Sequence, residues 1–465
     1  MGAEAPVEHD LRWPVVSLAE VATKIGSGAT PKGGADVYLP SRTRFALVRS
    51  QNVFDRRFDH NGLVFITDEQ ANGLRGVILQ ADDILLNITG DGITFGRACI
   101  VPKDVLPACV NQHVSIIRLD SQRANAGYVL AFLTHPEVKT YIESFNAGGS
   151  RRAITKGHIE SFRLPLPPIP EQRAIARILG TLDDKIELNR RMNETLEAMA
   201  RALFKSWFVD FLPVRANMEA RNRKARTQTG DPVRAKAAGR DPSLPKHLAD
   251  LFPDSFEDSE LGEIPKGWDV ETLADFSSLN PETWSKDARP DIINYVDLSN
   301  TKWGRIEAIA TYSQQDAPSR AQRVLQPQDT IVGTVRPGNG SYAFISEDGL
   351  TGSTGFAVLR PISHIYAEFI YFAATASENI EALSHLADGG AYPAVRPEVV
   401  VATQVIRPDS DVLALFSRLT GPLVGRMAQN EHESRTLAAL LDTLLPKLIS
   451  GELRLRQLTN GRSHE

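Results

Sequence analysis

Three short stretches of the chain contain residue types found in catalytic loops, but none completes a catalytic motif. GDGITFG, at residues 90–96, lacks G-x-G-x-x-G spacing and is predicted to be a hairpin or loop. SLNPETW contains Asn280 and Pro281 without the aromatic ending of an adenine-methyltransferase loop. Pro253 and Asp254 are followed by EIPK, in which Lys266 stands one place too late for a nuclease pattern. The ten histidines show no metal-ligand spacing, so neither a catalytic site nor a metal site is predicted.

Cationic, amide and hydroxyl side chains gather in loop-like stretches of both halves of the chain. Such side chains bind base edges, and lysine and arginine also bind phosphates, so these residues are candidates for DNA binding. For each residue taken alone, ordinary surface exposure is the alternative. The candidates in the first half are Lys32, Arg42, Arg44, Arg49, Gln51, Asn52, Arg97, Gln112, Arg151, Arg152, Lys156 and His158. Those in the second half are Ser299, Asn300, Lys302, Arg336, Asn339, Tyr392 and Arg396.

The elements that must position these residues occur twice, because the chain is an internal duplication. WPVVSLAEV from Trp13 resembles WDVETLADF from Trp268, and VILQADDILLN from Val77 resembles VLQPQDTIVG from Val324. Short β-branched runs between Gly, Asp or Pro predict strands, and YVLAFLTHPEVKTYIESF and AEFIYFAATASENIEALSHL have a helical period. Each half is therefore predicted to be an α+β unit followed by a long helix.

Each predicted long helix carries a seam of mostly apolar residues spaced alternately four and three apart. The seam of the first helix contains Ile175, Leu179, Leu182, Ile186, Asn189, Asn193, Leu196 and Leu203. The seam of the second contains Leu423, Met427, Asn430, Leu437, Leu441 and Leu444. One such stripe alone would indicate packing on its own domain, but two matched seams predict an antiparallel pair with a pseudo-twofold axis. That pairing would bring Asn193 near Asn430, and Asn189 near Ser434, in a polar layer that fixes the register.

Bulk properties indicate a globular protein of two to four domains. The chain has 465 residues and a net charge of −5, and no apolar run is long enough to span a membrane. Its first residues do not resemble a signal peptide, and Cys99 and Cys109 are expected to pack as small apolar side chains, so a cytoplasmic protein is predicted. A basic stretch from Arg201 to Lys246 is followed by an acidic one. This segregation indicates either a solvated linker or a surface for a charged partner.

Three segments of the chain carry a resemblance to a known family. PLPPIPEQRAIARILGTLDDKIELNRRMNETLEAMARALFKSWFVDF closely resembles the central conserved region of type I restriction-modification specificity subunits. PDSFEDSELGEIPKGW is similar to the start of their second recognition domain, and LLPKLISGEL resembles their distal conserved region. The resemblance implies two target-recognition domains, each reading half of a split double-stranded DNA site, with an antiparallel helical spacer and no catalytic site in this chain.

The resemblance also implies partners. Two modification subunits would carry S-adenosylmethionine and methylate adenine, and two restriction subunits would use ATP and magnesium for translocation and cleavage. Phe204, Trp207 and Phe208 offer apolar surface on which modification subunits are expected to dock. The alternative is that these rings pack against the neighbouring recognition unit. A second function also stays open, that of a repeated scaffold that binds proteins and not DNA.

The expected domain limits follow the conserved segments. They are target-recognition domain 1 (1–168), a central helix (169–211), a linker (212–262), target-recognition domain 2 (263–408), a distal helix (409–453) and a tail (454–465).

Overall fold

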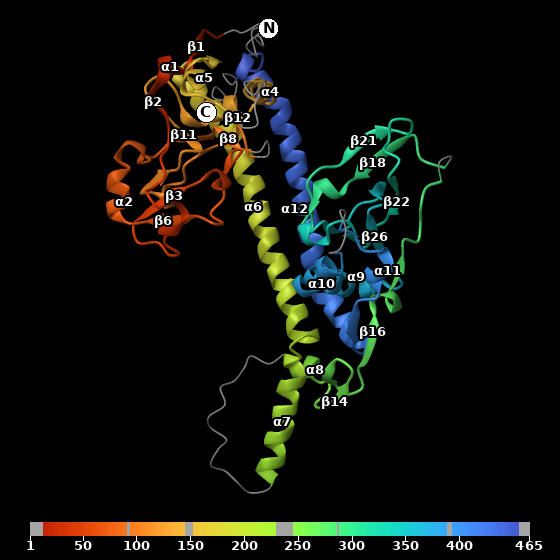
Figure 1. Ribbon diagram of the computed structural model, residues 1–465. Helices are drawn as coiled ribbons and strands as arrows, with labels where there is room; N and C mark the ends of the chain where they lie inside the picture. Colours follow the sequence, from red (N-terminus) through yellow and green to blue (C-terminus); the bar gives the residue numbers. More distant parts are fainter. Residues whose placement is uncertain are drawn as a thin grey trace, which may run out of the picture. The chain divides into compact units, whose positions relative to one another are not determined.

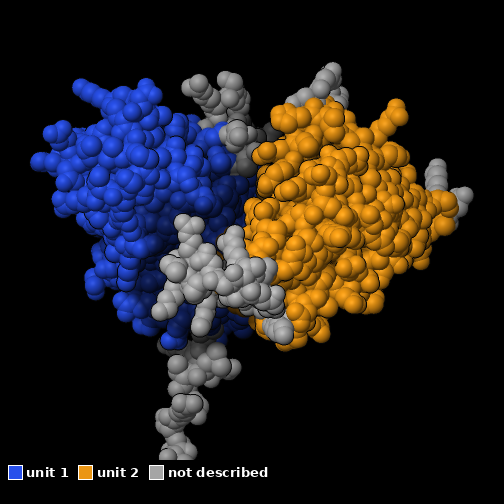
Figure 2. All heavy atoms as spheres, turned by 90° about the horizontal axis from the view of Figure 1, so that it is seen from below, with its two compact units in different colours: residues 1–190, 431–465 blue, residues 191–430 orange. Residues whose placement is uncertain are grey.

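The computed structural model describes residues 13–90, 94–144, 152–228, 245–285, 288–387 and 393–454. The chain divides into two compact units, unit 1 (residues 1–190 and 431–465) and unit 2 (residues 191–430), which Figure 2 colours separately. Each unit combines the α+β part of one sequence repeat with one end of each long helix, α6 (Ile169–Phe208) and α12 (Ser410–Ser450). The predicted domain limits instead gave each helix a segment of its own. No helix in the described ranges is long and apolar enough for a membrane span.

Unit 1 is built on two sheets, in the strand orders β2-β11-β7-β9 and β10-β3-β6. Figure 1 labels β2 and β11 of the first sheet and β3 and β6 of the second. Its strands are β1 (Val15–Ser17), β2 (Ala22–Ser27), β3 (Phe45–Val48), β4 (Val53–Phe54), β5 (Arg57–Phe58), β6 (Val64–Ile66), β7 (Ile84–Asn87), β8 (Thr89–Gly90), β9 (Ala98–Ile100), β10 (Ala108–Val110), β11 (Val114–Leu119), β12 (Arg152–Ala153) and β13 (Arg163–Pro165). Its shorter helices are α1 (Leu18–Val21), α2 (Asp68–Gly73), α3 (Ala126–Leu133), α4 (Pro136–Ser144) and α5 (Lys156–Glu160). The continuous apolar run of β7 is fully buried, as expected for a strand covered on both faces.

Unit 2 contains two four-stranded sheets, in the orders β17-β26-β23-β24 and β21-β18-β25-β22. Its strands are β14 (Phe256–Ser259), β15 (Gly262–Pro265), β16 (Asp269–Thr272), β17 (Ser277–Leu279), β18 (Ile292–Val296), β19 (Thr301–Lys302), β20 (Arg305–Ile306), β21 (Ala310–Ser313), β22 (Ala321–Leu325), β23 (Thr330–Gly333), β24 (Tyr342–Phe344), β25 (Leu350–Ser353), β26 (Phe356–Pro361) and β27 (Gln404–Arg407). Its shorter helices are α7 (Leu212–Gln228), α8 (Lys246–Ala249), α9 (Ala367–Ala374), α10 (Ser377–Ala387) and α11 (Pro397–Val401).

The segment predicted as a linker, residues 212–262, is partly structured. It contains α7, α8 and β14, and Val214 and Phe252 are buried in the core of unit 2. Asn217 Nδ2 donates to the carbonyl oxygens of Ala249 and Phe252, at 2.8 and 2.9 Å. The charge pattern did not predict these elements, because a helix with few buried apolar residues has the same polar composition as a solvated linker.

The same buried ion pair occurs in both repeats. In unit 1, Arg118 donates two hydrogen bonds of 2.7 Å to Asp83, which lies in the turn before β7. In unit 2, Arg360 donates to Asp329, before β23, at 2.9 and 3.0 Å. Both carboxylates are fully buried and also accept a backbone N–H from the residue three positions earlier. A two-hydrogen-bond arginine pair compensates a buried carboxylate well, so this contact fixes the turn before the central strand in each unit.

The two long helices pack antiparallel within each unit. In unit 1, Asn189 Nδ2 donates to Ser434 Oγ at 3.3 Å and to Glu433 Oε2 at 2.9 Å, while Ile175 and Leu179 share a core with Leu441. In unit 2, Asn430 Nδ2 donates to Asn193 Oδ1 at 2.8 Å. These are the two pairings expected from an antiparallel seam. The buried asparagines therefore form a hydrogen-bonded polar layer, which only one register satisfies.

The remaining seam residues are buried or half-buried. Leu441 is buried with Ile175 and Leu179, and the half-buried ones are Leu182, Ile186, Leu196, Leu203, Leu423, Met427, Leu437 and Leu444. Gly451 has a φ of +78° directly after α12, which is the left-handed conformation typical of a helix end.

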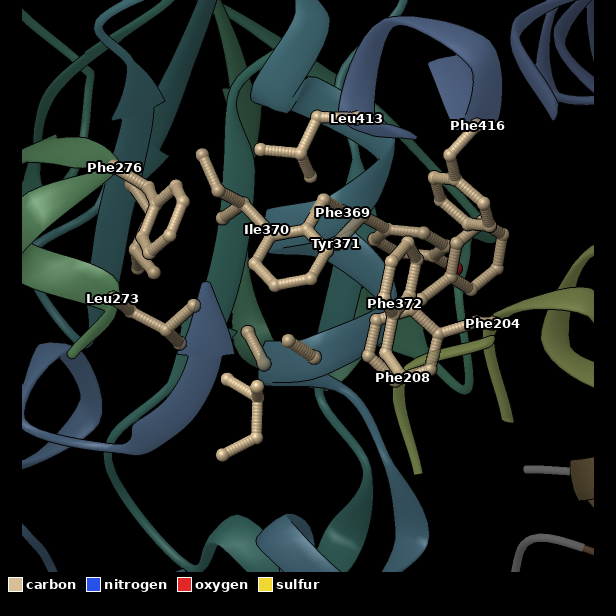
Figure 3. Close-up of a cluster of buried hydrophobic side chains, with 14 of the residues drawn as sticks. Phe204, Phe208, Leu273, Phe276, Phe369, Ile370, Tyr371, Phe372, Leu413 and Phe416 are labelled. Carbon is tan, nitrogen blue, oxygen red and sulfur yellow. The ribbon is translucent and has the colours of Figure 1, made fainter. Parts of the chain in front are cut away.

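The core of unit 2 contains a cluster of aromatic rings, and this corrects the expectation that Phe204, Trp207 and Phe208 are docking surface. Phe204, Phe208, Phe372 and Phe416 gather in Figure 3, and the Phe208 and Phe416 ring centroids lie 5.0 Å apart. Trp207 is 1% exposed. These rings pack the C-terminal end of α6 against α9 and α12. Burial of their large apolar surface stabilises this packing. The three rings therefore pack against their own recognition unit, which was the alternative expectation.

One half-buried carboxyl in unit 1 makes stability depend on pH. Burial raises the pKa of Asp183, on α6, from 3.8 to about 6, although Arg56 at 3.7 Å opposes the effect. The folded state therefore binds this proton more tightly than the unfolded state. Its contribution to stability is present below about pH 4 and is lost as the pH rises through 6.

Asp183→Asn is therefore expected to stabilise unit 1 at pH 7.5, by up to about 3 kcal/mol, and to have little effect near pH 4. Thermal unfolding of the two proteins across this pH range measures the difference, and exposed Asp184→Asn is the matched control. A stabilisation that is equal at both pH values would show that the carboxyl is not responsible.

Candidate nucleic-acid interface

In unit 1 the ends of the parallel strands β3 and β10 bring several candidate residues to one edge. Arg49 follows β3 and Gln112 lies just beyond β10, and parallel strands end at the same side of a sheet. Arg49 Nη2 donates to the carbonyl of Gly62 at 2.5 Å, and exposed Gln51 donates to the same oxygen at 3.4 Å. The first helical turn after β3 is therefore fixed by its own side chains.

A second group of candidates in unit 1 lies near the same edge of the β3–β10 sheet, next to the short strand pair β8–β12. β8 pairs with β12, so the backbone of Arg152 lies opposite Gly90. Thr89 Oγ1 lies 2.6 Å from Nδ1 of the exposed His113, which is next to Gln112. Thr89 and His113 were not among the residues predicted from the sequence, although both follow buried strands. Beyond β12, exposed Lys156 forms an ion pair with Glu160 at 3.4 Å and half-buried His158 caps α5.

Other unit 1 candidates have structural partners. Asn52 is fully buried and donates to the carbonyls of Asp59 and Asn61, so its amide is not available to DNA. Arg42 and Arg44 lie before β3, at the opposite end of the strand from Arg49.

Arg42 and Arg44 both contact neighbouring segments of unit 1. Arg42 donates to the carbonyls of Asp104 and Leu106 at 2.6 and 2.8 Å, and Arg44 pairs with Asp68 at 3.7 Å. The Arg97 guanidinium stacks over Phe54, 4.4 Å from the ring centroid. Lys32 is exposed in the turn before residues 34–37. Arg151 lies outside the described residues.

In unit 2 three loops meet at one end of the sheet that contains β23 and β24. The loop after β23 contacts the segment after residue 392, because Val395 N–H donates to Thr334 O and Arg336 N–H to Pro393 O, both at 2.9 Å. It also contacts the β19–β20 hairpin, because Trp303 N–H donates to Gly340 O at 2.6 Å. These hydrogen bonds bring together segments that are almost a hundred residues apart in the chain.

The unit 2 candidates lie on these three loops. Four of them are exposed cations or amides: Lys302, Arg336, Asn339 and Arg396. Ser299 is also exposed, but its hydroxyl donates to Asp297 at 2.7 Å, and Asn300 is half-buried. Tyr392 lies outside the described residues. The exposed set can donate several hydrogen bonds to base edges or phosphates from one surface, which agrees with the chemistry expected of a DNA contact.

Metal-binding clusters and reactive thiols are not found among the described residues. No cluster of His, Cys, Asp or Glu in these ranges could hold a metal ion. Burial raises the pKa of Cys109 to about 11 and that of Cys99 further, so both thiols stay protonated at neutral pH.

Comparison with known proteins identifies the class. The family model for the type I restriction modification DNA specificity domain matches residues 11–198. The type I restriction enzyme HindI specificity subunit of Haemophilus influenzae is 24% identical over 445 residues, which cover 87% of this chain and 94% of that protein. The MjaIX specificity subunit of Methanocaldococcus jannaschii is 23% identical over 463 residues, covering 96% and 94%. The S subunit of a type I system from M. genitalium has the same fold, with a TM-score of 0.54 at 14% identity over 97% of this chain and 99% of that one.

The match therefore extends over nearly the whole chain and includes both units and both long helices. The chain belongs to the specificity subunits of type I restriction-modification systems. It is the DNA-specificity component of such a complex and is not itself catalytic, and the cofactors of these systems reside on the modification and restriction subunits.

Proposed function

We propose that each unit of this chain reads one half of a bipartite, asymmetric site on double-stranded DNA, and that α6 and α12 set the gap between the halves. The observation that carries this proposal is that both units present polar loops at the end of a sheet, from equivalent places in the duplicated sequence. Exposed cations beside amide side chains suit phosphates and base edges together.

The proposed asymmetry is supported by the different side chains at equivalent positions. The hairpin β4–β5 of unit 1 corresponds to β19–β20 of unit 2, and both follow a short helical turn. In unit 1 its tip is Asp55 and Arg56, and Asp55 accepts a hydrogen bond from Lys139 at 2.9 Å. In unit 2 the tip is Trp303 and Gly304. Two loops with such different chemistry are suited to different half-sites.

We further propose that two modification subunits dock on exposed faces of the long helices, one on each unit, and that two restriction subunits complete the assembly in the cytoplasm. The segments Thr195–Met199 of α6 and Thr436–Leu440 of α12 stand 241 residues apart and are equivalent in the repeat. Met199 is 55% exposed and Leu440 is 43% exposed. An exposed alanine precedes each of them and an exposed threonine lies one turn earlier, so exposed apolar side chains are repeated where water would otherwise favour polar ones.

Met199→Glu and Leu440→Glu are each expected to weaken binding of one modification subunit by more than tenfold, and the double variant to lose both. A buried, unpaired carboxylate in an apolar interface costs more than the lost contact itself. Mass measurement of the assembled complex counts the bound subunits. Leu261→Glu, at an exposed leucine in the β14–β15 turn, is the control. Full assembly of the double variant would contradict this placement.

Selection from random duplex DNA by the complex of this chain with its modification subunits tests the main proposal. Enrichment of two different short motifs with a fixed gap is the expected result. The alternative, a repeated scaffold that binds only proteins, predicts assembly without any enriched sequence. Binding of a palindromic motif would contradict the proposed asymmetry.

A further inference from the structure

We propose that Trp303 is a specificity-determining residue of unit 2, and that its indole makes apolar contact with bases of the half-site that this unit reads. The inference rests on the proposed function, because it names a residue for DNA reading. It concerns a side chain that the sequence alone does not distinguish from a core tryptophan.

The exposure of Trp303 is the first observation. Its residue is 57% exposed at the tip of the β19–β20 hairpin, whereas Trp207 and Trp268 in the same unit are 1% and 2% exposed. Tryptophan is the side chain that gains most from burial, and exposed aromatic residues at loop tips are characteristic of binding surfaces. Unit 2 therefore keeps a large apolar group at its surface although its core buries Trp207 and Trp268.

The position of Trp303 is fixed by the backbone. Trp303 has a φ of +48°, a conformation that side-chain-bearing residues rarely adopt and that costs free energy to maintain. Its N–H donates to Gly340 O at 2.6 Å, and the N–H of Gly304 donates to Tyr342 O at 3.0 Å. The ring meets the ring of Tyr342 edge-on, with the centroids 6.1 Å apart. The indole is thus held in one place before any ligand binds, which lowers the entropy cost of binding.

Gly340 is the surface on which the indole lies. A Cβ atom at this glycine would come within 2.5 Å of the Trp303 ring, so only glycine leaves room for it. Gly340 also has a φ of +67°, which favours glycine independently. The loop after β23 and the β19–β20 hairpin therefore pack closely together beneath the exposed Trp303 ring.

The charges around Trp303 favour DNA as the occupant. Lys302 precedes it, and exposed Arg336 and Asn339 stand on the loop that bonds to its backbone. The acidic residues nearby on α6 are paired, because Glu194 contacts Arg305 at 3.3 Å and Glu197 contacts Arg201 at 2.8 Å. A cationic rim around an apolar group matches a groove, where phosphates flank the apolar parts of the bases such as the thymine methyl.

The equivalent place in unit 1 shows what a purely structural tip contains. Asp55 there binds Lys139, whose Nζ also donates to Gly96 O at 2.6 Å. Arg56 donates to Thr134 Oγ1 at 2.8 Å. These contacts hold the hairpin to α3 and α4 with side chains, whereas the Trp303 ring lies on Gly340 and beside Tyr342 and stays largely exposed. The two tips therefore serve different purposes in the same fold.

The test uses the complex of this chain with its modification subunits and compares wild type with Trp303→Ala. The expected result is about tenfold weaker binding of the selected duplex, unchanged binding of a scrambled duplex, and loss of preference at positions of one half-site only. Trp303→Phe should retain part of the preference. Gly340→Ala, which displaces the ring without deleting it, should weaken selected-duplex binding as Trp303→Ala does.

Ile362→Ala is the matched control, because Ile362 is 61% exposed and follows β26 at the opposite end of the sheet from Thr334. It should leave affinity and selected motif unchanged. Identical motifs and affinities for wild type and Trp303→Ala would overturn the inference. So would an equal loss for both duplexes together with a lower Tm, which indicates a structural role. If wild type selects no split motif, the proposed function fails as well; if it does and Trp303→Ala matches it, only this inference fails.

Discussion

Lengthening α6 and α12 together by one heptad is expected to lengthen the gap in the selected DNA motif by about three base pairs. Seven helical residues add roughly 10 Å, and B-DNA rises about 3.4 Å per base pair. The heptads are inserted after Arg190 and after Asn430, where the chain passes between its two units, so that both halves of the seam keep their own contacts. Because three base pairs also turn the duplex by roughly 100°, affinity should fall while the new gap is preferred.

Insertion into α6 alone is the control for this prediction. It would add seven residues to one side of the antiparallel pair, so that the contacts on the two sides of the insertion could no longer be formed together. The hydrogen bond between Asn193 and Asn430 and that between Asn189 and Ser434 would then compete. Reduced thermal stability and a poorly defined gap are expected. An unchanged gap in the double insertion, with intact assembly, would show that the helices do not set the spacing.

Phe416→Ala is expected to destabilise unit 2 by about 3–5 kcal/mol. Phe416 is fully buried, and its ring lies 5.0 Å from that of Phe208 and 6.1 Å from that of Phe204. The cavity cannot collapse easily, because rings on α6, α9 and α12 meet there (Figure 3). Denaturant unfolding measures the loss, and the half-site read by unit 2 should lose its influence on binding before the other half-site does.

Leu419→Ala is the matched control for Phe416→Ala. Leu419 lies one turn further along α12 and is 40% exposed, so its truncation should change the free energy of unfolding by less than about 1 kcal/mol. Unit 1 has a separate core, in which Ile175, Leu179 and Leu445 are buried, and its unfolding should be affected less by Phe416→Ala. Equal effects of the two variants would contradict the role given to the aromatic cluster.

Much of the fold follows from the sequence because its signals are periodic and repeated. The four-three spacing of the seam predicted helices that the structure has as α6 and α12, and the register of the repeat led to the contact of Asn193 with Asn430. An amphipathic pattern forty residues long has few competing structures, and antiparallel pairing is the arrangement that buries both seams within one chain. The resemblance to specificity subunits rests on these same long segments.

The loops were less predictable, because a residue type alone does not say what its side chain bonds to. Asn52 and Arg97 have the chemistry of DNA contacts, yet the first is buried on backbone carbonyls and the second is stacked on Phe54. The rings of Phe204, Trp207 and Phe208 suggested an exposed surface and form a core instead. Asp83 and Asp329 lie inside the quoted repeats, but their arginine partners, Arg118 and Arg360, lie more than thirty residues away.

The sequence by itself determined the duplication, the α+β units, the paired helices and the class of protein, because each depends on patterns that extend over many residues. Only the tertiary structure decided which polar residues meet at the ends of the sheets and which aromatic residues are exposed. Those outcomes depend on single long-range contacts, such as Trp303 with Gly340 or Arg336 with Pro393. The free energy that selects them comes from packing and hydrogen bonds between distant segments, which local patterns do not contain.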